Sequence, residues 1–145
     1  MKDSVLNEEN VVDAVCGYFG RRGLIVTQKL RTTQRGTDII AERQRDGRKI
    51  LVEAKGDTST RPGTSRHGKP FTASQIRTHT GVALLKAAEL LQLNGRARTT
   101  VCIAVPDSDR QRRVFRGIDG CLRQLGVTLL LVDPASMKVS ARPSI

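Results

Sequence analysis

Two acidic residues and a lysine, Asp38, Glu53 and Lys55, have the residue types and the spacing for chemistry on a phosphodiester. Two carboxylates can hold a hard divalent cation, which can activate a water molecule beside a phosphate group. An ammonium group next to them can orient that water or stabilise negative charge as it develops. This chemistry requires that all three side chains reach one surface, so the elements around them decide whether it is possible.

The segments that carry these residues predict two strands joined by a tight hairpin. Residues 37–43 and 49–55 are rich in Ile, Val and Leu, with polar residues between them. The dipeptide Asp46-Gly47 lies between the two segments, and Asp-Gly is typical of a two-residue type I′ turn. We therefore expect an antiparallel pair of strands closed at Asp46 and Gly47.

The register of this hairpin predicts which side chains meet. With a two-residue turn, Ile40 faces Glu53 and Asp38 faces Lys55. Because side chains alternate along a strand, Asp38, Glu53 and Lys55 share one face of the sheet. Asp38 and Glu53 are then diagonal neighbours, about 7–8 Å apart. An ordinary cross-strand ion pair between Asp38 and Lys55 is the alternative interpretation.

Residues 36–38 (Gly-Thr-Asp) and residues 53–55 (Glu-Ala-Lys) resemble the motif of the PD-(D/E)xK phosphodiesterase superfamily, which has the restriction-endonuclease-like fold. The resemblance implies that Asp38, Glu53 and the backbone carbonyl of Ala54 bind Mg²⁺, with Mn²⁺ able to substitute. It also implies that Lys55 orients or activates the attacking water. Thr37 occupies the position before the aspartate, where the motif's name has a proline.

A further acid on the first helix often completes the site in that family. Residues 5–19 predict an amphipathic helix with Val5 and Val12 on its apolar stripe, and Glu8 falls inside that stripe. A carboxylate on the core side needs a partner, so Glu8 is the candidate for this role. The alternative is that Glu8 and Glu9 only interact favourably with the helix dipole.

The order of elements predicts an α/β protein with a restriction-endonuclease-like core, in which helices flank a mixed central sheet. We expect residues 1–145 to form a single domain with the order α-β-β-β-α-β-α-β, because late strands that alternate with helices favour parallel crossovers. Besides the first helix and the hairpin, the expected elements are strand 24–30, helix 74–93, strand 99–105, helix 106–125 and strand 127–132, with a possible short edge strand after residue 135.

A long irregular segment, residues 56–72, leaves the hairpin directly after Lys55 and contains several basic residues. It is interpreted as an arm that grips nucleic acid, or else as a surface insertion. Ser74 would cap the following helix. Gln75 in its first turn resembles a glutamine that some branches of the family carry, which implies that it positions a phosphate, although His79 stands where their pattern has Tyr. The candidate nucleic-acid contacts are Arg61, Arg66, Lys69, Arg77, Arg110 and Arg113.

Composition favours a polyanionic partner. The net charge is +11, from 25 Lys and Arg against 14 Asp and Glu, and a basic balance of this size attracts phosphates. Aromatic residues make up only 3% of the chain, which disfavours a protein that binds single strands by stacking bases on aromatic side chains. Three cysteines without metal-site spacing and the lack of a long apolar run indicate a cytoplasmic protein with no membrane partner.

These observations predict a Mg²⁺-dependent endonuclease that hydrolyses DNA, and the absence of a recognisable base-reading motif favours selection of branched structures over sequences. The resemblance extends to small stand-alone nucleases such as Holliday junction resolvases, which implies a homodimer. A protein partner that supplies specificity is also compatible with the small size. The alternative is a module that binds nucleic acid without cutting it and that keeps the nuclease fold.

Overall fold

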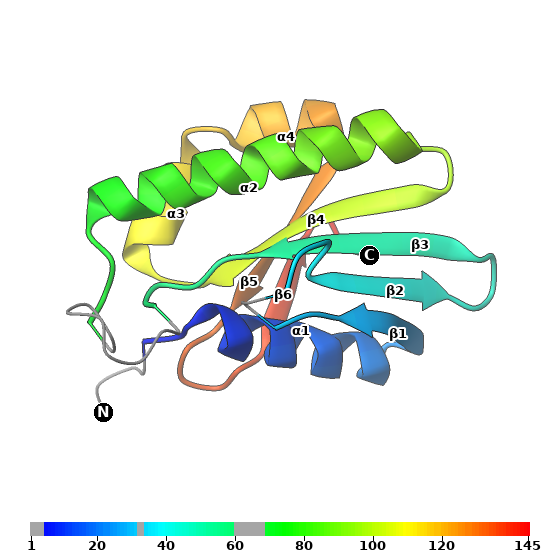
Figure 1. The fold of residues 1–145 in the computed structure, drawn as a ribbon, viewed down its shortest axis with the longest axis horizontal. Coiled ribbons are helices and arrows are strands. Elements are labelled where there is room, and N and C mark those ends of the chain that lie inside the picture. The colour runs from blue at the N-terminus through cyan, green and yellow to red at the C-terminus, as the bar shows by residue number, and fades with distance from the viewer. Residues whose placement is uncertain (1–4, 32–33, 60–68) are drawn as a thin grey trace.

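The computed structural model describes residues 5–31, 34–59 and 69–145. A six-stranded sheet forms its centre, and helices cover both faces (Figure 1). The elements are α1 (Glu8–Arg21), β1 (Leu24–Lys29), β2 (Ile39–Arg43), β3 (Arg48–Ala54), α2 (Ala73–Asn94), β4 (Thr99–Pro106), α3 (Asp109–Arg116), α4 (Asp119–Leu125), β5 (Val127–Val132) and β6 (Val139–Arg142).

The sheet is mixed, and its strands lie side by side in chain order from β1 to β6. β1, β2 and β3 form an antiparallel meander, whereas β3, β4 and β5 are parallel. The parallel connections pass through α2 and through the pair α3 and α4, since parallel neighbours need a crossover. The predicted α/β class and the mixed sheet flanked by helices are therefore confirmed.

Two apolar cores lie on the two faces of the sheet. On one face, α1 places Val15 and Phe19 against strand residues that include Ile50. On the other face, α2, α3 and α4 cover a second core that includes Ala83 and Ile103. β3 is buried on both faces from Ile50 to Ala54, which explains why its sequence is almost continuously apolar. The charged Glu53 is the exception within this buried run.

Several predicted helix ends differ from the structure. α1 begins at Glu8 rather than at residue 5, because Asn7 caps it and forms a capping box with Asn10. Val5 therefore precedes the helix. α2 begins at Ala73, since its cap is Thr72 and not the predicted Ser74.

The helix predicted over residues 106–125 is two helices, and the short edge strand expected after residue 135 is β6, which pairs antiparallel with β5. Ser108 caps α3, and Gly117 ends it at the C-terminal side. Glycine is a poor helix former, and the chain turns here before α4 starts at Asp119. The observed order is thus α-β-β-β-α-β-α-α-β-β, and this extends the predicted order without changing its core.

The predicted two-residue turn of the hairpin is wrong. Arg43 pairs with Arg48, so four residues connect β2 to β3. The amide of Gly47 donates to the carbonyl of Arg43 at 2.7 Å, and Gly47 adopts a left-handed conformation with φ 70°. The guanidinium of Arg43 holds the carboxylate of Asp46, which also accepts from the amide of Arg48 at 3.1 Å. These bonds favour the wider turn over the type I′ turn.

The wider turn shifts the register by two residues. Ile40 pairs with Leu51, not with Glu53 as predicted. A shift of two keeps every side chain on its predicted face, because the side-chain period of a strand is two. Extending the observed pairing of Ile39 with Val52 by one residue places Asp38 directly opposite Glu53, instead of opposite Lys55.

Within the described ranges, no helix combines the length and the apolar character that crossing a membrane requires.

Candidate active site

Asp38 and Glu53 bring two carboxylates together at the end of the hairpin, on the face of the sheet that α2 covers. Both are buried, with 7% of Asp38 and 3% of Glu53 exposed. The amide of Ala54 donates to Oδ2 of Asp38 at 2.8 Å and so fixes this carboxylate beside the last residues of β3. The structure therefore brings together the two acids that the sequence singled out.

Glu53 is held by two lysines, but only at long range. Nζ of Lys55 lies 3.8 Å from its Oε1, and Nζ of Lys86 lies 3.5 Å from its Oε2. Oε2 is buried and has no hydrogen-bond partner among the described residues. A buried carboxylate oxygen without a hydrogen bond is costly, and the charge of Lys86 offsets part of that cost.

Glu8 joins the site from the N-terminus of α1, which passes the end of β3. The close approach occurs at Gly56, where a Cβ atom would lie 2.5 Å from the backbone of Asn7 and Glu8. Only glycine permits this contact without a shift of the backbone. Glu8 is electrostatically coupled to both Asp38 and Lys55, as expected for an acid beside the hairpin pair.

Burial disfavours the ionised form of these carboxylates and so raises their pKa values. Desolvation, followed by repulsion from Asp38, raises the pKa of Glu53 to about 7. Desolvation and the charge of Asp38 likewise raise the pKa of Glu8 to about 7. Burial raises the pKa of Asp38 as well, although the amide of Ala54 and the two lysines oppose the shift. Near neutral pH, Glu8 and Glu53 would therefore each be partly protonated unless a metal cation replaces the proton.

The donor set fits a hard divalent cation that retains several water ligands. Asp38 and Glu53 supply carboxylate oxygens, one of which lacks a hydrogen bond. In the described part of the chain, no group of three or more His, Cys, Asp or Glu side chains is arranged to hold a metal ion. If a metal ion binds here, Asp38 and Glu53 are the two side chains that would hold it, and Mg²⁺ commonly keeps several water ligands beside one or two carboxylates.

Lys86 is a site residue that the sequence reasoning missed. Besides its contact with Glu53, its Nζ donates to the carbonyl of Gly36 at 3.4 Å and so links α2 to the segment before β2. The available signal was its position in α2, directly before the buried Ala87 and three residues after the buried Ala83. A lysine beside an apolar helical stripe must extend along the sheet, and here it ends at the carboxylates.

Gln75 has a structural partner in the helix cap. Its Oε1 accepts from the amide of Thr72 at 2.8 Å, while the hydroxyl of Thr72 accepts from the amide of Gln75 at 3.2 Å. This reciprocal pair is a capping box. The side-chain oxygen of Gln75 therefore stabilises the N-terminus of α2.

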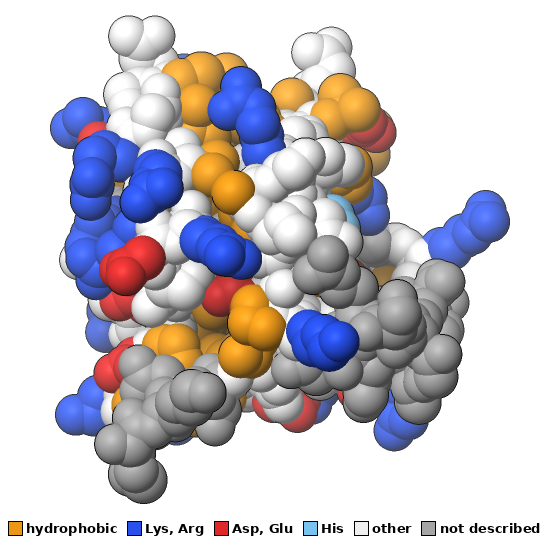
Figure 2. Space-filling view, turned by 90° about the vertical axis from the view of Figure 1, so that its left-hand side faces the viewer, with side chains coloured by type: hydrophobic (Ala, Val, Ile, Leu, Met, Phe, Trp, Pro, Cys, Tyr) orange, Lys and Arg blue, Asp and Glu red, His pale blue; other side chains and the backbone are white. Residues whose placement is uncertain are grey.

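The predicted nucleic-acid contacts are spread over several elements. Arg77 is exposed near the start of α2, and Arg113 is exposed on α3. Arg110 donates to the carbonyl of Phe71, and exposed Lys69 accepts through its carbonyl from Thr58. Arg61 and Arg66 lie outside the described residues. Figure 2 views the side that lies on the left in Figure 1, where α2 begins, and shows Lys and Arg side chains beside Asp and Glu side chains on this face.

The described ends of the segment 56–72 form several hydrogen bonds, and residues 60–68 lie outside the described residues. The amide of Asp57 donates to the carbonyl of Leu6, and the amide of Phe71 donates to the carbonyl of Asp57. The buried Gln111 of α3 donates from Nε2 to Oδ1 of Asp57 at 2.8 Å. Asp57 therefore ties the two ends of the segment to each other, to Leu6 before α1 and to α3, a role that its sequence context did not indicate.

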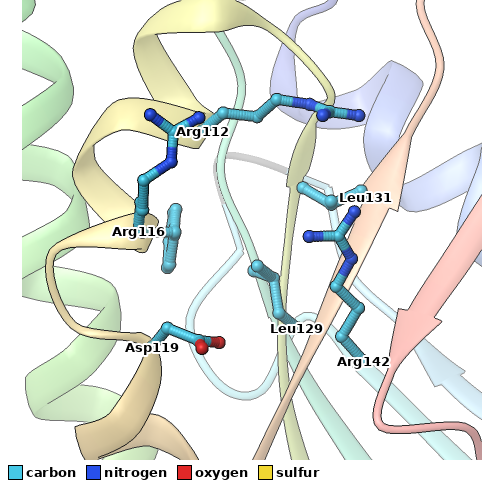
Figure 3. A pocket seen from close by; sticks show the side chains of 7 residues that line it. Arg112, Arg116, Asp119, Leu129, Leu131 and Arg142 are labelled. Atoms are coloured by element: carbon cyan, nitrogen blue, oxygen red, sulfur yellow. The ribbon is translucent and has the colours of Figure 1, made fainter.

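A small cavity of about 180 Å³ lies elsewhere, between α3, α4, β5 and β6 (Figure 3). Arg112, Arg116 and Arg142 line it, above an apolar floor that includes Leu129. Arg112 forms an ion pair with Asp107, whereas Asp119, which also lines the cavity, pairs with Arg123 of α4. None of its lining residues belongs to the carboxylate site.

No family model matches this chain, and no curated protein matches it. Two solved structures have a similar fold. One is an fdxN element excision controlling factor protein from Anabaena variabilis, with 21% identity, a TM-score of 0.53, and 91% of this chain and 96% of that chain covered. The other is an XisH family protein from Nostoc punctiforme, with 20% identity, a TM-score of 0.52, and 90% and 96% coverage. At this identity, the likeness shows that the chain shares their fold over nearly its whole length.

Proposed function

We propose that this protein is a metal-dependent endonuclease that hydrolyses phosphodiester bonds in DNA. The proposal rests above all on the buried pair Asp38 and Glu53, in which Oε2 of Glu53 has no hydrogen-bond partner in the described residues. Two buried carboxylates that repel each other are unfavourable for folding, and a divalent cation would remove that cost. The PD-(D/E)xK resemblance assigns the same two residues to the same task.

Each residue of the site has a role that its position supports. Asp38, Glu53 and the carbonyl of Ala54 would hold Mg²⁺, or Mn²⁺ in its place. When bound, the cation lowers the pKa of a ligated water and stabilises charge on the phosphate. The Lys55 ammonium, next to Glu53, would orient the attacking water or stabilise the negative charge that develops on the phosphate. Glu8 would accept a proton or a hydrogen bond from a water at the open side of the site.

The choice of DNA rests on charge and on the neighbours. The net charge of +11 favours a polyanionic substrate. One protein of the same fold is named as an element excision controlling factor, and a role connected with excision is compatible with an enzyme that acts on DNA. A preference for branched DNA, a homodimeric state and a specificity partner belong to the same proposal.

A non-catalytic nucleic-acid-binding module is the second candidate, and one observation favours it. Lys55 and Lys86 both lie within 4 Å of Glu53 and could balance the buried acids as a structural ion cluster, with no need for a metal. Such clusters can serve packing or specificity of the fold alone. The two candidates differ in what happens to a bound phosphodiester.

Cleavage of labelled four-way junction, flap and linear duplex DNA distinguishes the candidates. The assay compares Mg²⁺, Mn²⁺ and EDTA for the parent protein, for Lys55→Ala and for the matched control Lys138→Ala, which removes an exposed lysine of the β5–β6 turn. We expect metal-dependent cutting by the parent and the control, and a loss of about a hundredfold or more in Lys55→Ala. Binding of all three DNAs without cutting in any metal would instead support the binding module.

A further inference from the structure

A concentration of basic residues lies at the opposite end of the sheet from the carboxylates. This is the right-hand end in Figure 1. It comprises the β2–β3 turn with its flanking residues and the connection from α2 to β4. We call it the distal basic end. Its basic residues are Arg43, Arg45, Arg48, Lys49, Arg96 and Arg98.

The two ends are separated by the length of β3. This strand runs from Arg48 at the distal basic end to Ala54 at the carboxylates, and its six steps span about 20 Å. Lys49 pairs with Thr99 at the start of β4, which brings the α2–β4 connection alongside the hairpin turn. The sheet topology therefore gathers these residues far from the carboxylate pair.

The arginines of this end are held mainly by neutral acceptors. Arg48 donates to the carbonyls of Arg96 and Ala97, at 3.4 and 2.9 Å. Arg98 donates to the carbonyl of Asp46 at 3.2 Å. These bonds orient each guanidinium group but leave its charge uncompensated. An arginine that is fixed in this way loses little further entropy when it binds an oxyanion.

Few acids oppose this charge. The acidic residues of the distal basic end are Glu42 and Asp46. Of these, Asp46 forms an ion pair with Arg43 in the described part of the chain. The cavity of Figure 3 differs, because Arg112 there forms an ion pair with Asp107. The imbalance at the distal basic end is therefore a local property and not only a reflection of the overall composition.

The C-terminus of α1 extends the same surface. Arg21 and Arg22 line an open hollow together with Arg43 and Arg45. A second hollow beside it is lined by Arg43, Arg48 and Arg96. The surface is thus concave and basic, with guanidinium groups on several sides, a shape that can follow a phosphate backbone.

We propose that the distal basic end binds a second segment of duplex DNA, separate from the segment held at the carboxylates. The proposal rests on the proposed function, since it assigns two DNA segments to one nuclease chain. A protein that grips one duplex arm while it cuts another would favour branched DNA over a linear duplex. Backbone contacts of this type carry little sequence information, so the structure of the DNA would select the substrate.

The test measures capture of a second duplex without cleavage. Immobilised duplex DNA is saturated with protein in EDTA, and the amount of a free fluorescent duplex that is retained is measured over a salt series. The variant is Arg21→Ala/Arg45→Ala, which removes two exposed arginines of this surface. The control is Arg116→Ala/Lys138→Ala, which removes the same charge from exposed positions elsewhere.

We expect the parent and the control to retain the second duplex and the variant to lose it. The slope of log binding constant against log salt should fall by about two in the variant, because each lost phosphate contact accounts for about 0.9. If the variant captures the second duplex as the parent does and its salt slope is unchanged, the proposal is wrong. A dimer that bridges two duplexes through its two carboxylate sites would give this result. Capture in a protein that never cuts DNA would refute the nuclease and leave this surface standing.

Discussion

Nζ of Lys86 lies 3.5 Å from Oε2 of Glu53, so a side chain from the middle of α2 reaches the carboxylate at the end of β3. The same ammonium group donates to the carbonyl of Gly36. Lys86 therefore lowers the cost of ionising Glu53. Replacing Lys86 should therefore change how strongly protons compete with a metal ion for the Glu53 carboxylate.

Lys86→Met should move metal binding to higher pH. The charge of Lys86 is one of the factors that oppose the raised pKa of Glu53, so its loss raises that pKa further. Protons then compete with Mg²⁺ up to a higher pH. The check is the Mg²⁺ dependence of thermal stability, measured from about pH 6 to about pH 9.

Lys86→Arg is the matched control for that shift, because it keeps the positive charge on a long side chain. We expect its pH profile to resemble that of the parent. A pH profile that is the same in all three proteins would show that Lys86 does not influence the ionisation of Glu53.

Gly56→Ala should damage the site through the backbone. The added Cβ would lie 2.5 Å from backbone atoms of Asn7 and Glu8, so the start of α1 must move away from Lys55. Overpacking of this kind costs about 1–3 kcal/mol in the free energy of unfolding. Gly20→Ala in α1 is the control, since its Cβ would meet nothing within 4 Å.

Denaturant unfolding and metal-dependent cleavage, measured together, check this prediction. Gly20→Ala should be at least as stable as the parent, because alanine favours the helix by about 0.5–1 kcal/mol. If Gly56→Ala is as stable and as active as the parent, the close approach does not position Glu8.

Without metal, the protein should lose stability as the pH rises. The pKa of Glu53 is about 7 in the folded protein, against 4.5 for an ordinary glutamate, so the folded state binds more protons between these values. The stabilisation is complete below about pH 4.5 and is lost as the pH passes through about 7, with an expected change of about 1–3 kcal/mol.

Glu53→Gln isolates this contribution, because the amide has nearly the same shape and does not ionise. In EDTA at about pH 8, this variant should melt above the parent, and its stability should vary less between about pH 5 and about pH 8. Mg²⁺ should stabilise the parent at the higher pH but not the variant. A parent that becomes more stable from pH 5 to pH 8 in EDTA would contradict the raised pKa.

Gln75→Ala should act on stability rather than on chemistry. Its Oε1 is used by the amide of Thr72, so the loss of this half of the capping box should cost about 0.5–1 kcal/mol. Thr72→Ala removes the other half and is the matched comparison. We expect similar melting temperatures and similar cleavage rates for the two variants. A cleavage defect confined to Gln75→Ala would support the phosphate-positioning role that the family resemblance implies.

The sequence alone determined which face of the sheet carries the two candidate acids. The predicted turn at Asp46 and Gly47 was two residues too short, yet Asp38 and Glu53 still lie on the predicted face. The reason is the two-residue period of a strand, which leaves the face unchanged when the register shifts by two. The alternation of strands and helices likewise sufficed for the mixed α/β fold, although it did not separate α3 from α4 at Gly117.

Only the tertiary structure decided what surrounds the acids. Lys86 reaches Glu53 because α2 packs across the sheet, and Glu8 arrives because α1 touches the chain at Gly56. Gln111 meets Asp57 for the same kind of reason, through the position of α3. Local patterns encode the period and the buried side of each element, whereas contacts between elements depend on how whole surfaces pack. Packing therefore determined the electrostatic environment of Asp38 and Glu53, which their own sequence context does not contain.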